Sequence, residues 1–392
     1  MDSKIAFKLG RVAGGEKTGD FTYNLRPFGH GHDDLIDRLN NIIVPFFLVV
    51  FAVYIGTEYL FSGPPIHCWC PAEFTDTHVD YVHHFCWIRN TYYVPLTQPI
   101  VEEARKNEEV VYYQWVSIIL LFMALMFKLP SVFWRLFYKD SGIQIDTISQ
   151  TAAQSQCMSW DERNQTVKNI ACDFQRWARV RAPRQRGLKY LKSLFSKRSG
   201  SYIVSLYFVQ KCLYCANTIG QFFLLDAFLG HDFYLQYGTD FFSGSVGNST
   251  MGLARFPRVT MCDFNVRQLQ NLPRWTVQCV LPLNMYNEKI FVFLWILYAL
   301  VAFLTSANLL LWIWRLMIHR NRVAYIQKFL MNCEGKTKDP TKEKHIQSFI
   351  QKQLHLDGIF VLRIAERNTG AVFIMDLVQE LWAVFDKRYE TR

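Results

Sequence analysis

Five cysteines carry the clearest chemical signal in this chain of 392 residues. Cys68, Cys70 and Cys86 lie in one polar segment, and Cys262 and Cys279 lie in a second segment far along the chain. Disulfides persist only in oxidising surroundings, so both segments are expected to face the outside of the cell. Disulfides between the two segments would join them into one rigid cap, and three connectivities remain open for two cysteines from each.

Other reactive side chains form no comparable pattern. Cys212 and Cys215 have the C-x-x-C spacing of redox and metal sites, but they lie in an apolar stretch without a second ligand pair. The first cysteine segment also contains four histidines without a repeating ligand spacing: His67, His78, His83 and His84. We therefore expect no metal and no cofactor, although a pH sensor stays open because imidazole titrates at about pH 6.5. Neither a glycine-rich phosphate loop nor a nucleophile triad is present, so an enzyme is the function class that the sequence supports least.

Three stretches without a charged residue are the elements that would position the cysteines. Residues 39–57 form a stretch of 19, residues 110–127 one of 18 and residues 290–314 one of 25. A helix rises about 1.5 Å per residue, so each stretch is long enough to cross a hydrocarbon layer about 30 Å thick. One such helix is plausible in a soluble core, but three helices without a polar face favour membrane spans.

A fourth span is expected within residues 199–230, which are apolar and aromatic but include Lys211 and Asp226. These two residues are 15 positions apart. That separation is about 22 Å of helix, so the two charges cannot pair at one depth. We expect Lys211 to extend to one membrane interface and Asp226 to lie at the other.

Basic residues favour the cytoplasmic side of a membrane, and this rule orients the spans. Residues 135–198 include 13 basic and 5 acidic residues, a net charge of +8, and residues 315–392 include 14 and 9, a net charge of +5. Residues 62–110 include 3 basic and 7 acidic residues, a net charge of −4, and are placed outside. The total of +10 is thus divided by the spans instead of forming one nucleic-acid-binding face, so no nucleic acid is expected as a partner.

The predicted architecture is an all-α polytopic membrane protein with both termini in the cytoplasm. The predicted parts are an N-terminal segment 1–40, spans 41–61, 111–134, 202–230 and 290–314, outer loops 62–110 and 231–289, a cytoplasmic loop 135–201 and a C-terminal domain 315–392. The cytoplasmic loop and the C-terminal domain are expected to form one helical dome, whose basic excess could attract anionic lipid headgroups. Asn248 begins a sequon in the second outer loop and is a candidate for glycosylation.

The residues that open the second span resemble the signature pentapeptide of the innexin family: Tyr112, Tyr113, Gln114, Trp115 and Val116. Further motifs follow in the order of that family. They lie at residues 34–40 before the first span, around Cys68 and at 90–96 in the first outer loop, and around Cys262 and Cys279 in the second. The resemblance extends over roughly residues 34 to 365.

The resemblance implies a gap-junction channel in the plasma membrane. A ring of subunits, expected to be an octamer of this chain or of this chain with other innexins, would surround a wide pore and dock with a ring of the adjacent cell. The resemblance also implies that Cys68 pairs with Cys279 and that Cys86 pairs with Cys262. Cys70 is a fifth outer cysteine where the family has four. It is a free buried thiol, a partner between subunits or a competitor for the partner of Cys68.

In the family, the N-terminal segment narrows the pore and the first span lines much of the rest. Lys4, Lys8 and Arg11 are then candidates for the pore vestibule, with a disordered leader as the equal alternative. Glu58 ends the first span and would form a ring of carboxylates that favours cations, or it is a simple surface acid. Pro130 removes a helix hydrogen bond in the second span and is expected to kink that helix.

Two alternatives to a gap junction remain open. One is an unpaired hemichannel that releases small molecules, since a glycan on Asn248 would obstruct end-to-end docking. The other is a non-conducting adhesion or regulatory protein that uses the same loops. Transfer of dye or current between paired cells separates these functions.

Overall fold

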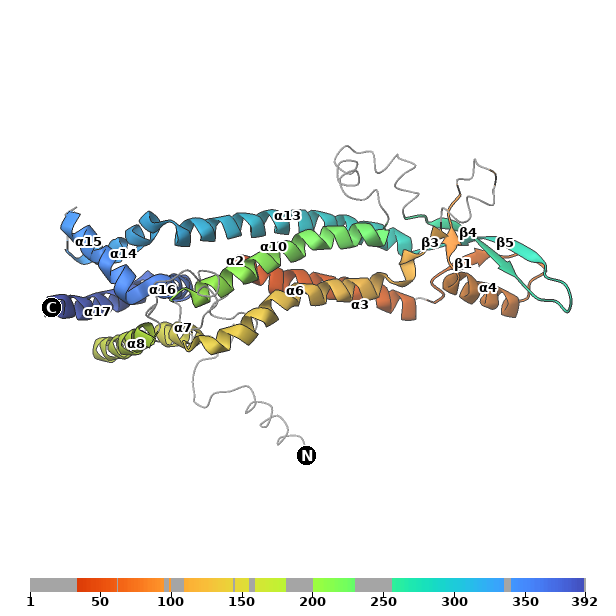
Figure 1. Ribbon diagram of the computed structural model, residues 1–392. Helices are drawn as coiled ribbons and strands as arrows, with labels where there is room; N and C mark the ends of the chain where they lie inside the picture. The colour runs from red at the N-terminus through yellow and green to blue at the C-terminus, as the bar shows by residue number, and fades with distance from the viewer. Residues whose placement is uncertain are drawn as a thin grey trace, which may run out of the picture.

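The computed structural model is one elongated bundle, in which long helices run side by side between a small sheet at one end and shorter helices at the other (Figure 1). The structure describes residues 34–61, 63–94, 99, 109–143, 145–154, 159–180, 200–229, 256–334 and 340–390. The two ends of the bundle hold the candidate sites, and the long helices separate them.

Among the described residues, three helices are long and apolar enough to cross a membrane: Leu35–Glu58, Val116–Tyr138 and Leu283–Met317. The first consists of α2 (Leu35–Arg38), a π-helical turn (Leu39–Ile43) and α3 (Val44–Phe61), and the others are α6 (Val116–Tyr138) and α13 (Leu283–Met317). Each extends beyond the predicted span at one end or both. Their helical form pairs most backbone polar groups within the segment, as a hydrocarbon surrounding requires. Leu48, Leu120 and Leu294 are fully buried in the core that the three helices share.

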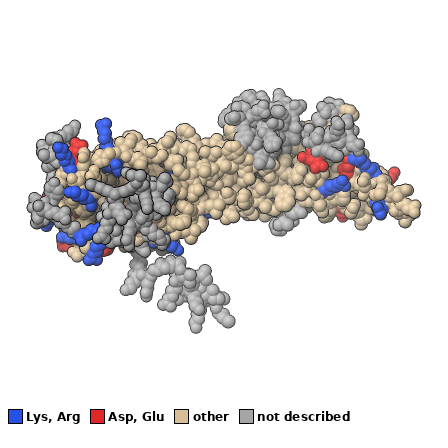
Figure 2. Space-filling model, viewed as in Figure 1, with Lys and Arg blue, Asp and Glu red and all other residues tan. Residues whose placement is uncertain are grey.

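A fourth long helix, α10 (Tyr202–Leu229), packs against α6 and α13. It has 28 residues, enough for about 42 Å of helix. In Figure 2 the middle of the molecule shows almost no charged side chain, whereas lysine, arginine and acidic residues gather at the two ends. This distribution is what a bundle with an apolar belt around its middle requires.

The cysteine-bearing loops form a five-stranded antiparallel sheet, which corrects the all-α expectation for this part of the chain. The strands are β1 (His67–Trp69), β2 (Thr91–Tyr92), β3 (Glu109–Val110), β4 (Val259–Asn265) and β5 (Arg274–Val280), in the spatial order β1-β5-β4-β2-β3. Alternate residues of β4 are buried, as a strand with one face on a core requires. A helix, α4 (Asp76–Ile88), packs beside β1 and β4. We call the sheet and α4 the cysteine domain.

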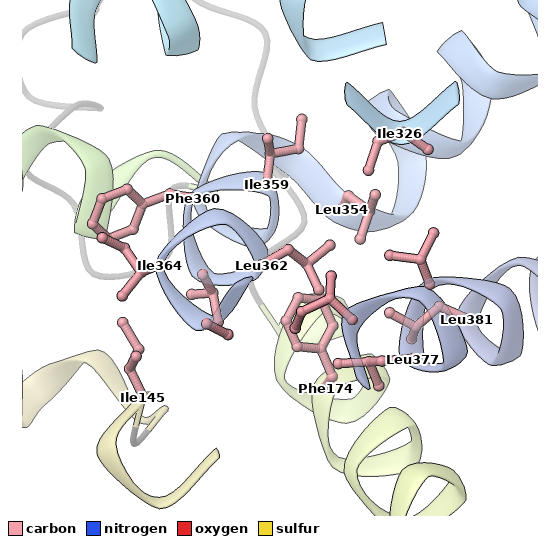
Figure 3. Packing of buried hydrophobic residues seen from close by; sticks show 14 of the residues in the cluster. Ile145, Phe174, Ile326, Leu354, Ile359, Phe360, Leu362, Ile364, Leu377 and Leu381 are labelled. Atoms are coloured by element: carbon pink, nitrogen blue, oxygen red, sulfur yellow. The ribbon is translucent and has the colours of Figure 1, made fainter. Parts of the chain in front are cut away.

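The opposite end of the bundle is all-helical and is called the dome below. Its elements are α7 (Ile145–Gln154), α8 (Trp160–Val180), α14 (His319–Glu334), α15 (Pro340–Phe349), a π-helical turn (Ile350–Leu354), α16 (His355–Thr369) and α17 (Ala371–Glu390). Two short 3-10 turns, Tyr112–Gln114 and Lys139–Ser141, flank α6. Figure 3 shows Ile145 and Phe174 in one cluster with Leu362 and Leu377. Helices that precede α10 in the chain therefore share a single core with helices that follow α13.

A close contact joins α16 to the beginning of α10. His355 has a φ of 54°, a value that residues other than glycine rarely adopt. A Cβ added at Gly200 would lie 2.7 Å from the Cβ of His355, so the contact requires glycine. The Oδ1 of Asp357 accepts a hydrogen bond from the N–H of Val204 at 3.0 Å. In this way α16 satisfies a donor at the first turn of α10.

Candidate functional sites at the two ends of the bundle

Two disulfides join the two loops that make up the cysteine domain. Cys68 of β1 is bonded to Cys279 of β5, and Cys86 of α4 is bonded to Cys262 of β4. Cys68 and Cys279 are also directly opposite each other in the β1–β5 ladder. This is the pairing that the family resemblance implied. The bonds close loops of 211 and 176 residues. In the chain-entropy account, closing a loop of that length stabilises the folded state by about 5 kcal/mol.

The fifth cysteine of this domain, Cys70, is a half-buried free thiol. Its Sγ donates a weak hydrogen bond to the carbonyl oxygen of Cys68 at 3.7 Å. Burial raises the pKa of the Cys70 thiol, which lowers the fraction of reactive thiolate. Within the single subunit Cys70 is a free thiol and Cys68 is bonded to Cys279, whereas pairing of Cys70 between subunits stays a prediction.

The four histidines of the cysteine domain are divided among separate surroundings. His78 forms a capping box with Thr75 at the start of α4, and the Nδ1 of His84 lies 2.8 Å from a main-chain oxygen of the same helix. The rings of His67 and His83 meet edge to face, with centroids 5.8 Å apart. The histidines therefore do not converge on one point where a metal could be held.

Candidate metal ligands are scarce in the described part of the chain. The one group with suitable spacing is Cys68, Cys86 and Cys279, whose Sγ atoms lie within 4.8 Å of one another. All three are oxidised in disulfides and offer no thiolate to a metal. The two cysteines of the C-x-x-C pair have different surroundings on α10. Cys212 is exposed, whereas the Sγ of Cys215 lies 3.4 Å from the Oγ of Ser306.

The signature pentapeptide connects the cysteine domain to the start of α6. The phenol of Tyr113 donates to the carbonyl oxygens of Cys86 and Trp87, each at 3.5 Å. The Nε2 of Gln114 donates to the carbonyl oxygens of Trp87 and Ile88. These are carbonyls at the end of α4, which have no partner within their own helix. The motif thus caps one helix while it begins the next, a role that the sequence pattern did not reveal.

The remaining pentapeptide residues face other surroundings. The ring of Tyr112 contacts Phe228 at the end of α10 and Phe256 before β4, with centroid distances of 6.2 and 5.5 Å. Val116 is fully buried, whereas Trp115 is exposed at the surface of the described chain. Tyr112 therefore adds the end of α10 to the elements that the pentapeptide connects.

A second candidate site lies at the dome end, where four charged side chains from three parts of the chain meet. We call Asp34, Asp37, Lys211 and Arg367 the charged cluster. The Nζ of Lys211 lies 2.7 Å from an oxygen of Asp37 and 3.8 Å from an oxygen of Asp34. Arg367 of α16 forms an ion pair with Asp34. The Nε1 of Trp312 on α13 donates to Asp34 at 2.9 Å.

The position of Lys211 corrects the expectation that it extends to a membrane interface. Its side chain is 1% exposed and is held by Asp37, which is 2% exposed. A buried ammonium is costly unless a carboxylate compensates it, and this pairing supplies that compensation. Burial alone would raise the pKa of Asp34, but Lys211, Trp312 and Arg367 together hold that pKa below its ordinary value. The signal in the sequence that could have indicated this ion pair was the presence of Asp34 and Asp37 at the start of one span and of Lys211 within another.

The predicted pore-lining residues lie apart from both sites or outside the described residues. Glu58 is half-buried near the end of α3 beside Tyr54, whose ring contacts Tyr286 of α13 at 5.7 Å. Pro130 is buried inside α6, which continues through it as one helix. The pore-lining candidates Lys4, Lys8 and Arg11 lie outside the described residues, as does the glycosylation candidate Asn248.

The apolar bundle and its two ends define a polytopic membrane protein with a disulfide-bonded domain at one end and a helical dome at the other. The family model for innexins matches residues 33–385. Innexin unc-9 of Caenorhabditis elegans is 36% identical over 362 residues, which cover 90% of this chain and 92% of that protein. Innexin-19 of Caenorhabditis briggsae is 35% identical over 391 residues, which cover 91% and 87%. The chain belongs to the innexin family, as its motifs predicted.

Proposed function

We propose that the chain is a subunit of a gap-junction channel that passes ions and small molecules between adjacent cells. One observation carries the proposal: the disulfides Cys68–Cys279 and Cys86–Cys262 join two distant loops into one domain at the end of the apolar helices. End-to-end docking needs a preformed surface that loses little conformational freedom on contact. A domain with two disulfides, in a chain of the innexin family, meets that need.

Four membrane spans and cytoplasmic termini are part of this proposal. The helix α10 lies against α6 and α13, and the pairing of Lys211 with Asp37 compensates the charge that makes α10 less apolar. The two segments of the chain that contribute helices to the dome have net charges of +8 for residues 135–198 and +5 for residues 315–392. The basic excess favours a cytoplasmic dome, which leaves the cysteine domain outside the cell.

A ring of subunits, expected to be an octamer of this chain or of this chain with other innexins, would form the pore. On α3 the exposed residues Phe46, Val50 and Val53 form an apolar stripe in the single subunit. Such a stripe is available for contact with lipid or with a neighbouring subunit. Conduction needs no covalent step, because an open pore lets solutes move down their gradients. The width of the pore and its electric field set the selectivity.

Charge at the two mouths would then tune the permeant ions. Glu58, repeated around the ring, would place carboxylates where α3 ends and would favour cations. The net charge of −4 on residues 62–110 acts in the same direction. Lys4, Lys8 and Arg11 remain candidates for the opposite vestibule.

Imaging of purified particles tests the proposal directly. The proposal predicts rings with a central pore and pairs of rings joined through their cysteine domains. The same preparation of Asn248→Gln shows whether a glycan on Asn248 limits docking. Single rings in both preparations would favour the unpaired hemichannel, and particles without a pore would favour the non-conducting adhesion protein.

A further inference from the structure

The first span begins at a residue that is bound by the dome. Asp34 is the N-cap of α2, and its Oδ1 accepts a hydrogen bond from the N–H of Leu35 at 2.9 Å. Its own N–H donates to Asp37 at 3.2 Å, which completes a capping box. Asp34 therefore fixes the direction in which the chain enters the first span.

The same carboxylate holds groups from three other helices. Its Oδ2 accepts from the indole N–H of Trp312 on α13 and lies 3.8 Å from the Nζ of Lys211 on α10. Its Oδ1 forms the ion pair with Arg367 on α16. The guanidinium of Arg367 also lies over the ring of Trp312, 5.0 Å from the centroid. One side chain thus joins the first span to two other long helices and to the dome.

The charges of the cluster balance only when the dome contributes its arginine. Asp34 and Asp37 are 10% and 2% exposed, and Lys211 is 1% exposed. Without Arg367, the carboxylate of Asp34 would have within the cluster only the ammonium of Lys211, 3.8 Å away and already paired with Asp37, to balance its negative charge. Because such a charge is poorly solvated there, displacement of α16 would weaken the hold on Asp34.

We propose that Arg367 is a positioning residue through which the dome sets the position of the start of the first span. A displacement of α16 would be transmitted to that position through Asp34, which also contacts Lys211 on α10 and Trp312 on α13. The expected consequence, a change in gating, rests on the proposed channel function. The structural part of the inference, the hold of Arg367 on Asp34, is independent of conduction.

The test uses a reporter thiol in the full-length protein. In Ile36→Cys, a half-buried position two residues after Asp34, site-specific labelling of the detergent-solubilised protein by a water-soluble maleimide is quantified by peptide mass spectrometry. We expect Arg367→Gln to raise the labelling rate about fivefold, because a partly exposed charged contact is lost. Arg367→Lys, which keeps the charge, should restore most of the protection.

Arg363 provides a matched control on the same helix. It donates to the main-chain oxygen of Asn321 and lies over the ring of Tyr325, outside the charged cluster. Arg363→Gln should leave labelling at position 36 within about twofold of the parent. Unchanged labelling in Arg367→Gln, or an equal rise in Arg363→Gln, would overturn the proposal.

Junctional currents supply the second readout. The voltage dependence of gating should shift in Arg367→Gln, return in Arg367→Lys and stay unchanged in Arg363→Gln. If labelling changes as expected and gating does not, Arg367 holds the start of the span without controlling the channel, and the proposed consequence for gating is rejected. If the parent chain gives no current at all, the proposed channel function fails, whereas the labelling result still decides whether Arg367 holds Asp34.

Discussion

Gln114 donates a hydrogen bond from its Nε2 to the carbonyl oxygen of Trp87, 27 residues earlier in the chain. Gln114 lies in the turn before α6, and Trp87 lies in the last turn of α4. The contact therefore connects a membrane helix to the cysteine domain through the main chain of α4. Tyr113 reinforces it, because its ring packs on Trp87 with centroids 4.8 Å apart. The signature pentapeptide is thus explained as a junction between two parts of the fold.

Substitutions of Gln114 that remove its amide donor or replace it with a carboxylate test this junction. Gln114→Leu removes the donor to the carbonyl oxygens of Trp87 and Ile88 and leaves Tyr113 as a donor to Trp87, at a cost of about 1–2 kcal/mol. Gln114→Glu should cost more, because a carboxylate would face carbonyl oxygens at hydrogen-bond distance. Thermal melting of the detergent-solubilised protein should rank the parent above Gln114→Leu and Gln114→Leu above Gln114→Glu. An equal melting temperature for all three would contradict the assigned role.

Removal of a disulfide should separate the structural cysteines from the free one. Cys86→Ser breaks the bond to Cys262 and should lower surface expression and junctional coupling severely, since loss of such a bond costs about 2–5 kcal/mol. Cys70→Ser is the matched control in the same loop, and we expect near-parental expression and coupling. Surface biotinylation and paired-cell currents measure both. A comparable loss in Cys70→Ser would show that this thiol has a partner outside the single subunit.

The buried pair in the charged cluster predicts a non-additive pair of substitutions. Lys211→Met leaves Asp37 buried without its ammonium partner, and we expect a loss of about 3–5 kcal/mol in the free energy of unfolding. Adding Asp37→Asn removes the orphaned charge and should recover part of that loss. A double-mutant cycle on thermal stability measures the coupling. Additive effects of the two substitutions would mean that the ion pair contributes nothing measurable.

The pH dependence of stability should report on His355 in the dome. Burial lowers the pKa of His355 below its ordinary value of 6.5. The folded state then binds fewer protons than the unfolded state, so stability is full above about pH 6.5 and falls as the pH drops toward the folded pKa. His355→Asn removes this titration and should flatten that part of the profile between about pH 7.5 and pH 5.5. An unchanged slope in the variant would assign the dependence to other groups.

The sequence predicted the long apolar helices well because the signal is local. Freedom from charge over 18 to 25 residues identifies α3, α6 and α13 without knowledge of any contact. The helix α10 was placed correctly as a helix, but Lys211 was assigned to an interface. A lysine that extends to water and a lysine paired inside the bundle look the same in sequence. The choice depends on Asp37, 174 residues away in the chain.

The cysteine domain shows a second limit. Its strands have seven residues at most, and β2 and β3 have two each, so their alternation is too short to read against the strong helical pattern elsewhere. The disulfides bring these short strands together, and the ladder between β1 and β5 forms around Cys68 and Cys279. The pairing of the cysteines came from the family resemblance, because spacing alone allows three connectivities. The ion pair of Asp34 with Arg367 has no local signal at all, since 333 residues separate the partners.

The most direct test of the central claim is the current between two cells that both express the chain and have no other junctional channel. The account predicts a junctional conductance when both cells express the parent chain and none when only one cell does. Cys86→Ser in either cell should abolish it, because docking requires the disulfide-bonded domain on both sides. Currents across the membranes of single cells, without any current between paired cells expressing either the parent or Asn248→Gln, would contradict the claim that this innexin forms gap junctions.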